Sequence, residues 1–198
     1  MALPDTPPEP PPDLARRALP VMELPSGISL IRIHRHTLGV LYFGAGHDNR
    51  FDSPDGAYGV CYTARTLEGA FAETCLRATG DRFVTTAFLA ERAFSAIPLT
   101  APLRLAALHG PGLSAMGATA AVTSGGHGVA RRWSAALHTH PDGVDGIAYL
   151  ANHDNKQLCV ALFDRCQPKL GPPSPAEGFL SDRRRLGALL KRYQVGLG

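Results

Sequence analysis

The sequence predicts a compact α+β domain built from short mixed strands and two or three helices. Short apolar and β-branched runs are separated by turn residues, which is typical of strands. Three segments repeat apolar residues at the 3.6-residue spacing of an amphipathic helix. Strands and helices do not alternate regularly, and no GxGxxG pattern follows a strand, so we do not expect a Rossmann domain.

Size and charge narrow the function classes. The chain has 198 residues, which suits one domain with extensions. Its apolar fraction of 44% and charged fraction of 19% are those of a globular protein with a buried core. The net charge of +3 suits an anionic small ligand, but it does not favour nucleic acid as a partner. These properties leave the oligomeric state open.

The amino-terminal segment, residues 1–23, is rich in proline. We expect a flexible or polyproline arm there, because proline lacks an N–H donor and fixes an extended backbone. The chain shows no hydrophobic signal core and no apolar run of the ~18–20 residues that a membrane span needs. Its four cysteines lack CxxC spacing and are expected to be reduced. We therefore expect a cytoplasmic protein without membrane contact.

The first strand is predicted over residues 27–36, "GISLIRIHRH". Side chains alternate along a strand, so Ile31 and Ile33 share one face while Arg32 and His34 share the other. A long loop with a turn at Pro54 follows, and it leads to a second short, buried strand, "GVCYTA".

A helix is predicted to begin after Thr66, which can act as its N-cap, and to end near Gly80. Glu68 lies in the first turn, where the helix dipole favours a carboxylate. The apolar stripe consists of Leu67, Ala70, Phe71, Thr74, Cys75 and Ala78.

The second half of the chain carries the remaining elements. We expect one or two strands in 82–99, a flexible glycine-rich loop in 109–128 and late strands in "GIAYLA" and "CVALFD". A second helix has the stripe Val129, Trp133, Ala136, Leu137 and His140. A basic carboxy-terminal helix from Ser181 has the stripe Leu186, Leu189, Leu190 and Tyr193.

Four motifs in order resemble the RES domain family, which is named for Arg, Glu and Ser positions. They are "LIRIH" with Arg32, "NRFD" with Arg50, "VCYTA" with Tyr62 and "AFAET" with Glu73. The second half, from "VARRWSAALH" through "DGIAYLANHD" to "CVALFD", is similar to the end of these domains. The resemblance spans roughly 24–166. It therefore suggests a RES-like domain over 24–170, with a loop and basic helix, 171–198, packed on it.

The resemblance implies an ADP-ribosyltransferase-like fold and an enzyme that degrades NAD. Such proteins are the toxins of bacterial toxin–antitoxin pairs, so an antitoxin protein is the implied partner. They are described as NAD phosphorylases or glycohydrolases. NAD is then the substrate, inorganic phosphate is the co-substrate of a phosphorylase, and neither a metal nor a prosthetic group is required.

The resemblance also implies roles for five residues. Glu73 would hold the ribose and stabilise the oxocarbenium-like state that forms when the nicotinamide bond breaks. Arg50 would join it in catalysis, and Arg32 would bind the pyrophosphate, because guanidinium groups hold phosphate oxygens in a fork. Tyr62 would stack on the nicotinamide ring, with Tyr58 behind it.

One position departs from the family pattern. Where the family has a serine, this sequence has Ala151, followed by Asn152. Three alternatives follow: a slow enzyme, an enzyme that uses Ser124, Asn152 or His153 instead, or a domain that binds a nucleotide or a partner without turnover.

Other motifs have plainer interpretations. The pair in "HTHP", His138 and His140, lacks the further ligands of a zinc site, and we predict a helix end there. His34 and His36 also lack further ligands, and the "HGPGLSAMG" loop lacks the Lys-Ser/Thr of a phosphate loop. The run Arg183–Arg185 is expected to be the solvated face of the last helix.

Overall fold

A mixed β-sheet forms the centre of the molecule in the computed structural model, which describes residues 7–76 and 83–198. Within these ranges, eight strands pair in the order β1-β6-β7-β8-β3-β2-β5-β9. Within this eight-stranded sheet, only the β6–β7 pair is parallel. The strands are β1 (Val21–Leu24), β2 (Ser29–Arg35), β3 (Val60–Ala64), β5 (Arg92–Pro98), β6 (Leu103–Ala107), β7 (Gly146–Ala151), β8 (Asp154–Phe163) and β9 (Glu177–Gly178).

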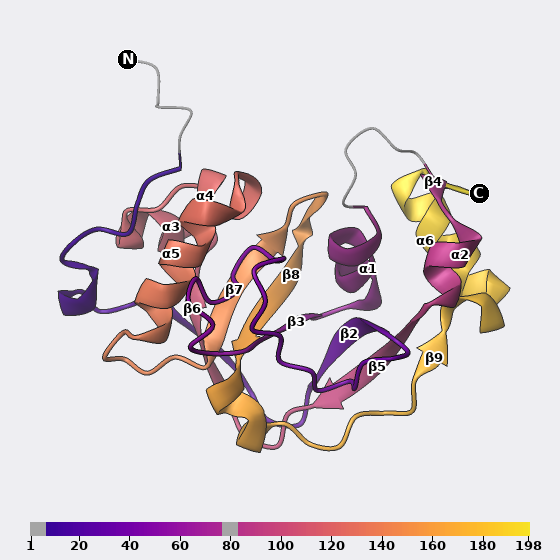
Figure 1. Ribbon diagram of the computed structural model, residues 1–198, viewed down its shortest axis with the longest axis horizontal. Coiled ribbons are helices and arrows are strands. Elements are labelled where there is room, and N and C mark those ends of the chain that lie inside the picture. The colour runs from indigo at the N-terminus through magenta and orange to yellow at the C-terminus, as the bar shows by residue number, and fades with distance from the viewer. Residues whose placement is uncertain (1–6, 77–82) are drawn as a thin grey trace, which may run out of the picture.

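The helices gather in three places over this sheet (Figure 1). One group lies beside β6 and β7 and consists of α3 (Pro111–Met116), α4 (Ala121–Ser124) and α5 (His127–His138). At the opposite side lie α2 (Thr86–Ala90), α6 (Arg183–Tyr193) and a small parallel pair of β4 (Phe83–Val84) with β10 (Gly196–Leu197). Between these groups lies α1 (Leu67–Cys75). Short 3-10 helices are η1 (Leu14–Arg16), η2 (Asp164–Lys169) and η3 (Phe179–Ser181).

Both faces of the sheet are apolar. The larger core packs α1, α5 and α6 against one face around Phe71, Trp133 and Phe163, all fully buried. A smaller core on the other face includes Leu30, Cys61 and other strand residues. These contacts confirm an α+β domain whose three longest helices, α1, α5 and α6, are the ones that apolar periodicity predicted.

The strands β2 and β3 separate from each other shortly after they meet. Their one ladder pair is Ile31 with Ala64, whereas β2 pairs with β5 along its whole length. The chain between them turns back so that Gly44 forms a bridge with Val60. Side chains near this separation therefore need not pack against a neighbouring strand, and they become available to line a cavity.

The described part of the amino-terminal segment is not a flexible arm. Leu14 and Leu19 are buried, and β1 pairs with β6. The Trp133 indole donates to the carbonyl of Pro8 at 2.7 Å. Proline carbonyls accept hydrogen bonds although proline has no donor of its own, so this segment packs against α5 while remaining extended. The packing of residues 7–23 contradicts the flexible alternative of the prediction and leaves the polyproline alternative open.

The glycine-rich stretch 109–128 is also more ordered than its sequence suggested, because it contains α3 and α4. Gly110 has a positive φ of 52° before the Pro111 that begins α3. A Cβ on Gly112 would lie 2.0 Å from the carbonyl oxygen of Ala107, so glycine lets α3 pack closely on β6. These glycines serve packing, and the loop prediction is wrong.

The structure also tests the strands predicted between residues 82 and 99 and the helix predicted after Thr66. The interval 82–99 holds the helix α2 as well as strands, and β6 lies in a stretch for which no strand was predicted. The Thr66 hydroxyl accepts from the backbone N–H of Gly69 at 3.0 Å, which confirms the predicted N-cap of α1. The predicted end of that helix near Gly80 lies outside the described residues.

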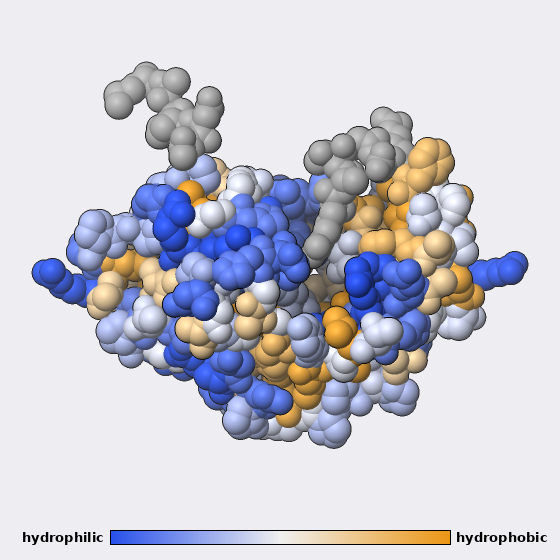
Figure 2. Space-filling model, in the orientation of Figure 1, coloured by the Kyte–Doolittle hydropathy of each residue, from blue (hydrophilic) through white to orange (hydrophobic). Residues whose placement is uncertain are grey.

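Apolar side chains reach the surface beside α2 and α6 (Figure 2). Phe83, Leu180 and Leu197 are exposed there. In the described parts of the chain, no helix has the length and apolar character needed to cross a bilayer.

Candidate active site

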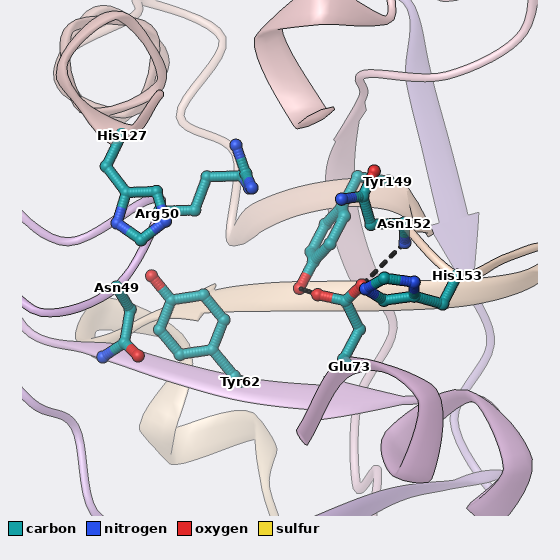
Figure 3. A pocket seen from close by; sticks show the side chains of 8 residues that line it. All are labelled: Asn49, Arg50, Tyr62, Glu73, His127, Tyr149, Asn152 and His153. Atoms are coloured by element: carbon teal, nitrogen blue, oxygen red, sulfur yellow. Dashed lines mark hydrogen bonds between the residues drawn. The ribbon is translucent and has the colours of Figure 1, made fainter. Parts of the chain in front are cut away.

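A cavity of about 300 Å³ brings together three of the five residues that the sequence singled out (Figure 3). We call it the reaction pocket. Arg50 comes from the loop before β3, Tyr62 from β3 and Glu73 from the last part of α1. The full lining is Asn49, Arg50, Tyr62, Glu73, His127, Tyr149, Asn152 and His153.

The Glu73 carboxylate is held by two donors from outside its own helix. The Tyr149 hydroxyl donates to Oε2 at 3.3 Å, and the backbone N–H of Asn152 donates to Oε1 at 2.8 Å (Figure 3). Burial, followed by the neighbouring Glu73 charge, holds the pKa of Tyr149 well above its usual value, so this hydroxyl keeps its proton. The carboxylate is thus fixed in orientation at the wall of the pocket.

Ala151 does not contribute a polar group to this arrangement. Its side chain is buried and packs in the larger core. The donor to Glu73 is instead the next backbone N–H, that of Asn152, just beyond an irregularity in the β7–β8 ladder. This hydrogen bond therefore comes from the main chain and does not depend on the side chain at position 151.

The loop that carries Arg50 is clamped to β3 through Tyr62. The Tyr62 hydroxyl donates to Asp52 at 2.9 Å and accepts from the backbone N–H of Phe51 at 2.8 Å. Asp52 also accepts from the backbone N–H of Asn49 at 2.8 Å. These bonds fix the phenol end of Tyr62, so its ring presents a defined face to the pocket.

The Arg50 side chain reaches toward the helical side of the pocket. One guanidinium nitrogen donates to the carbonyl of Gly125, at the end of α4. His127, the first residue of α5, lines the same side (Figure 3). A planar guanidinium held in this way can bind an anionic group in the pocket.

Three residues that line the pocket were not predicted from the sequence: Tyr149, His127 and Asn49. Tyr149 lies two residues before Ala151, and strand alternation puts both on one face, so this relation was a usable signal. His127 and Asn49 gave no signal, because each enters from a loop or a helix start whose position depends on the fold. Two proposed substitutes for the serine, Asn152 and His153, lie in the pocket.

Tyr58 lies outside the reaction pocket. It is buried, its hydroxyl is 2.8 Å from the Ser134 hydroxyl, and its ring stacks on His138 at a centroid distance of 3.9 Å. Burial raises its pKa to about 12. The expectation that Tyr58 supports nicotinamide binding is therefore wrong, because the ring is sealed in the protein interior.

Arg32 lines an adjoining cavity of about 430 Å³, which we call the basic pocket. The two pockets share Asn49 and Tyr62. The lining of the basic pocket is Arg32, Ile33, His34, Arg35, Leu38, Tyr42, Gly44, Asp48, Asn49, Val60, Tyr62, Thr74, Phe88 and Arg92. Strand separation between β2 and β3 opens this space, and it keeps Arg32 apart from Glu73.

Arg32 is only 9% exposed, yet none of the carboxylates in the described residues pairs with its guanidinium group. Its Nη1 donates to the carbonyl of Tyr42 at 2.6 Å and contacts the Cys61 sulfur. A guanidinium has five N–H donors, so donors remain for a ligand. A buried positive charge without a counterion favours an anion in the basic pocket.

The histidines of "HTHP" have structural roles. α5 ends at His138, as predicted, and His138 stacks on Tyr58. His140 is buried, with Nε2 3.1 Å from the carbonyl oxygen of Leu14. Across the described parts of the chain, no cluster of His, Cys, Asp and Glu has the arrangement of a metal site.

Comparisons with known proteins identify the family and the fold of this chain. The RES domain family matches residues 29–179. A Sinorhizobium fredii protein described as "Probable toxin y4kH" is 33% identical over 103 residues, which cover 52% of this chain and 80% of the relative. A chain in the crystal structure of the M. tuberculosis MbcT–MbcA toxin–antitoxin complex has the same fold, with a TM-score of 0.60 and 16% identity over 93% of this chain and 96% of that one. Because the family match spans more than half of the sequence, this chain belongs to the RES domain family.

Proposed function

We propose that this protein is an NAD-degrading enzyme, a phosphorylase or glycohydrolase that cleaves the bond between nicotinamide and ribose. The observation that carries the proposal is the Glu73 carboxylate, held by Tyr149 and the Asn152 N–H, in one pocket with Arg50 and Tyr62. Family membership supports the choice of NAD as the substrate.

Glu73 would act on the ribose. As the bond from C1′ to the nicotinamide nitrogen breaks, the bonding electrons leave with nicotinamide and positive charge develops on the sugar. A carboxylate that accepts a hydrogen bond from the 2′-hydroxyl stabilises this charge. Because its orientation is fixed before substrate binds, little reorganisation is needed in the transition state.

The other groups would position the substrate. The Tyr62 ring, fixed through Asp52, gives nicotinamide a face to stack on. The Arg50 guanidinium would hold a phosphate of the dinucleotide or an attacking inorganic phosphate. Arg32, at the wall of the adjoining pocket, would bind the phosphate attached to the reacting ribose.

The acceptor decides the product. Attack by water gives ADP-ribose, nicotinamide and a proton, whereas attack by inorganic phosphate gives a phosphorylated ADP-ribose and nicotinamide. Purified protein should release nicotinamide from NAD, and chromatography of the products with and without phosphate identifies the acceptor. Absence of nicotinamide release at high protein concentration would contradict the enzymatic proposal.

We propose a toxin role in the cytoplasm, with an antitoxin protein as the partner. The relatives that support it are a protein named as a probable toxin and a structure that contains a toxin with its antitoxin. Expression in a bacterial host should arrest growth and lower cellular NAD, and Glu73→Gln should abolish both effects. Growth arrest with unchanged NAD would separate toxicity from the proposed chemistry.

A second candidate, a nucleotide- or partner-binding module without turnover, is favoured by Ala151 at the family's serine position. Such a module would bind NAD in a manner sensitive to Arg50→Ala but would release no nicotinamide.

A further inference from the structure

We propose that the basic pocket binds the distal half of a dinucleotide, meaning the second phosphate and the adenosine. In this assignment Arg35 and Arg92 hold the phosphate, and Tyr42 and Leu38 provide an apolar surface for adenine. The inference rests on the proposed function, since it places the part of NAD that the reaction pocket does not hold.

The small volume of the reaction pocket points to a second site for the rest of the dinucleotide. The reaction pocket, at about 300 Å³, is at the lower end of the ~300–1,000 Å³ that small-molecule sites occupy, so it suits nicotinamide and its ribose alone. Two cavities share residues with it. The basic pocket shares Asn49 and Tyr62, and a smaller cavity of about 250 Å³ shares Asn152. We call the smaller one the neutral pocket.

Charge distinguishes the two cavities. The basic pocket has Arg32, Arg35 and Arg92 in its wall against one carboxylate, Asp48. The lining of the neutral pocket contains no Lys, Arg, Asp or Glu, and burial lowers the pKa of its histidine, His109. A pyrophosphate carries two negative charges, so it favours the cavity walled by guanidinium groups.

Arg35 and Arg92 are cross-strand partners. They lie directly opposite each other in the β2–β5 ladder. Like charges at such positions are destabilising, and an anion bound between them would offset that cost. Among the described residues that line the basic pocket, the other charged groups are Arg32, which adds to the positive charge, and the single carboxylate Asp48. This pairing is a reason, independent of cavity shape, to expect an anion here.

Arg92 is also preorganised. Its guanidinium lies over the Phe88 ring, 3.4 Å from the centroid, and its Nη1 donates to the Phe88 carbonyl at 2.8 Å. The side chain is 12% exposed, and Glu91, 3.7 Å away, is 68% exposed. A side chain already held in one conformation loses less entropy when it binds a ligand.

The rim of the basic pocket offers an apolar surface. Tyr42 is 46% exposed and Leu38 is 39% exposed, and both line this cavity. Large apolar side chains exposed beside arginines match a ligand that joins a flat aromatic base to phosphate groups.

Comparing NAD with nicotinamide mononucleotide tests the assignment, because the mononucleotide lacks the distal phosphate and the adenosine. Arg35→Ala and Arg92→Gln should each lower kcat/KM for NAD by ~10-fold or more, since each removes a charge-assisted hydrogen bond, and leave kcat/KM for the mononucleotide unchanged. Arg35 is exposed, so its variant should fold normally. His109→Ala in the neutral pocket and Arg183→Gln on α6 are the matched controls and should alter neither substrate.

Equal losses for both substrates, no loss for NAD, or a loss for NAD alone in His109→Ala would overturn the assignment. If the parent protein cleaves neither substrate, the proposed function fails, and calorimetry with ADP-ribose and ribose 5-phosphate still tests the pocket. The parent should then bind ADP-ribose more tightly, and Arg35→Ala should reduce that affinity alone by ~10-fold. Equal affinity for both compounds, or no binding of ADP-ribose, would contradict the inference.

Discussion

The two walls of the pocket around Glu73 differ in the groups that they contribute. One wall, formed by the loop before β3, by β3 and by α1, presents the side chains Arg50, Tyr62 and Glu73 to the pocket. The other wall, the β7–β8 hairpin, supplies the Tyr149 hydroxyl and the main-chain N–H of Asn152. The first wall depends on residue identity, whereas a main-chain donor is kept by almost any residue. A substitution in the hairpin that keeps the main-chain donor should therefore be better tolerated than a change in the first wall.

Among the substitutions that compare the two walls, the largest effect is expected in the first wall, from Glu73→Asp. The charge is kept, but the carboxylate moves away from both donors and from the ribose, and a displacement of ~1 Å can cost ~100-fold in rate. Nicotinamide release measures the effect. Glu68→Asp on the same helix is the matched control and should retain the parental rate. A Glu73→Asp variant that is as fast as the parent would show that the exact position of the carboxylate does not affect the rate.

The next effect separates main chain from side chain in the hairpin. Asn152→Ala keeps the N–H that holds Glu73 Oε1 and should retain activity, whereas Asn152→Pro removes it and should lower the rate by ~10–100-fold. Thermal unfolding of both variants shows whether the hairpin is intact. Equal activities in two folded variants would mean that the main-chain bond does not matter.

A smaller effect is expected from Tyr149→Phe. The ring stays in the core, where it packs edge-on against Phe51, and only the 3.3 Å bond to Glu73 is lost. A rate reduction of up to ~10-fold follows from a net hydrogen-bond contribution of ~1 kcal/mol. Steady-state kinetics should show the loss in kcat. A change confined to KM would instead assign Tyr149 to substrate binding.

The smallest effect tests the missing serine directly. Because Asn152 already donates to Glu73 and the Ala151 side chain is buried, Ala151→Ser should change the rate by less than ~10-fold. A gain of ~100-fold would indicate that the serine hydroxyl has a role that the main chain does not replace.

Acid should destabilise the fold through three fully or partly buried histidines. Burial lowers the pKa of His34, His109 and His138 from their usual 6.5, so these groups bind protons more readily in the unfolded chain. Their stabilising contribution is present above pH 6.5 and is lost as the pH falls below it. The Tm should therefore fall on acidification, and His138→Gln should make the fall shallower. A Tm that rises with acid would contradict these shifts.

The sequence correctly predicted features that depend on neighbouring residues, such as helix caps, apolar stripes and strand alternation. The N-cap Thr66, the stripe of α5 and the alternation of Ile31 with Arg32 all correspond to observed elements. The expected place of Tyr58 beside the pocket was wrong, because its stacking on His138 is a long-range contact that sequence spacing does not encode.

The packing of the proline segment and the presence of α3 were not predicted, for a related reason. Each is stabilised by packing on a distant element, Pro8 on Trp133 and Gly112 on Ala107, and neither has a strong local pattern. In the site, the order of the motifs predicted that Arg50, Tyr62 and Glu73 line one pocket, and they do. The two donors to Glu73 from the hairpin could not be predicted, because this requires knowing where β7 lies against α1.

The most direct test measures nicotinamide release and NAD affinity on the same samples of parent protein and Glu73→Gln. The parent should release nicotinamide, and the variant should lose that activity by ~100-fold or more while binding NAD with similar affinity, because the neutral amide no longer stabilises the developing charge. Equal release by the two proteins, or NAD binding without release by the parent, would contradict the account.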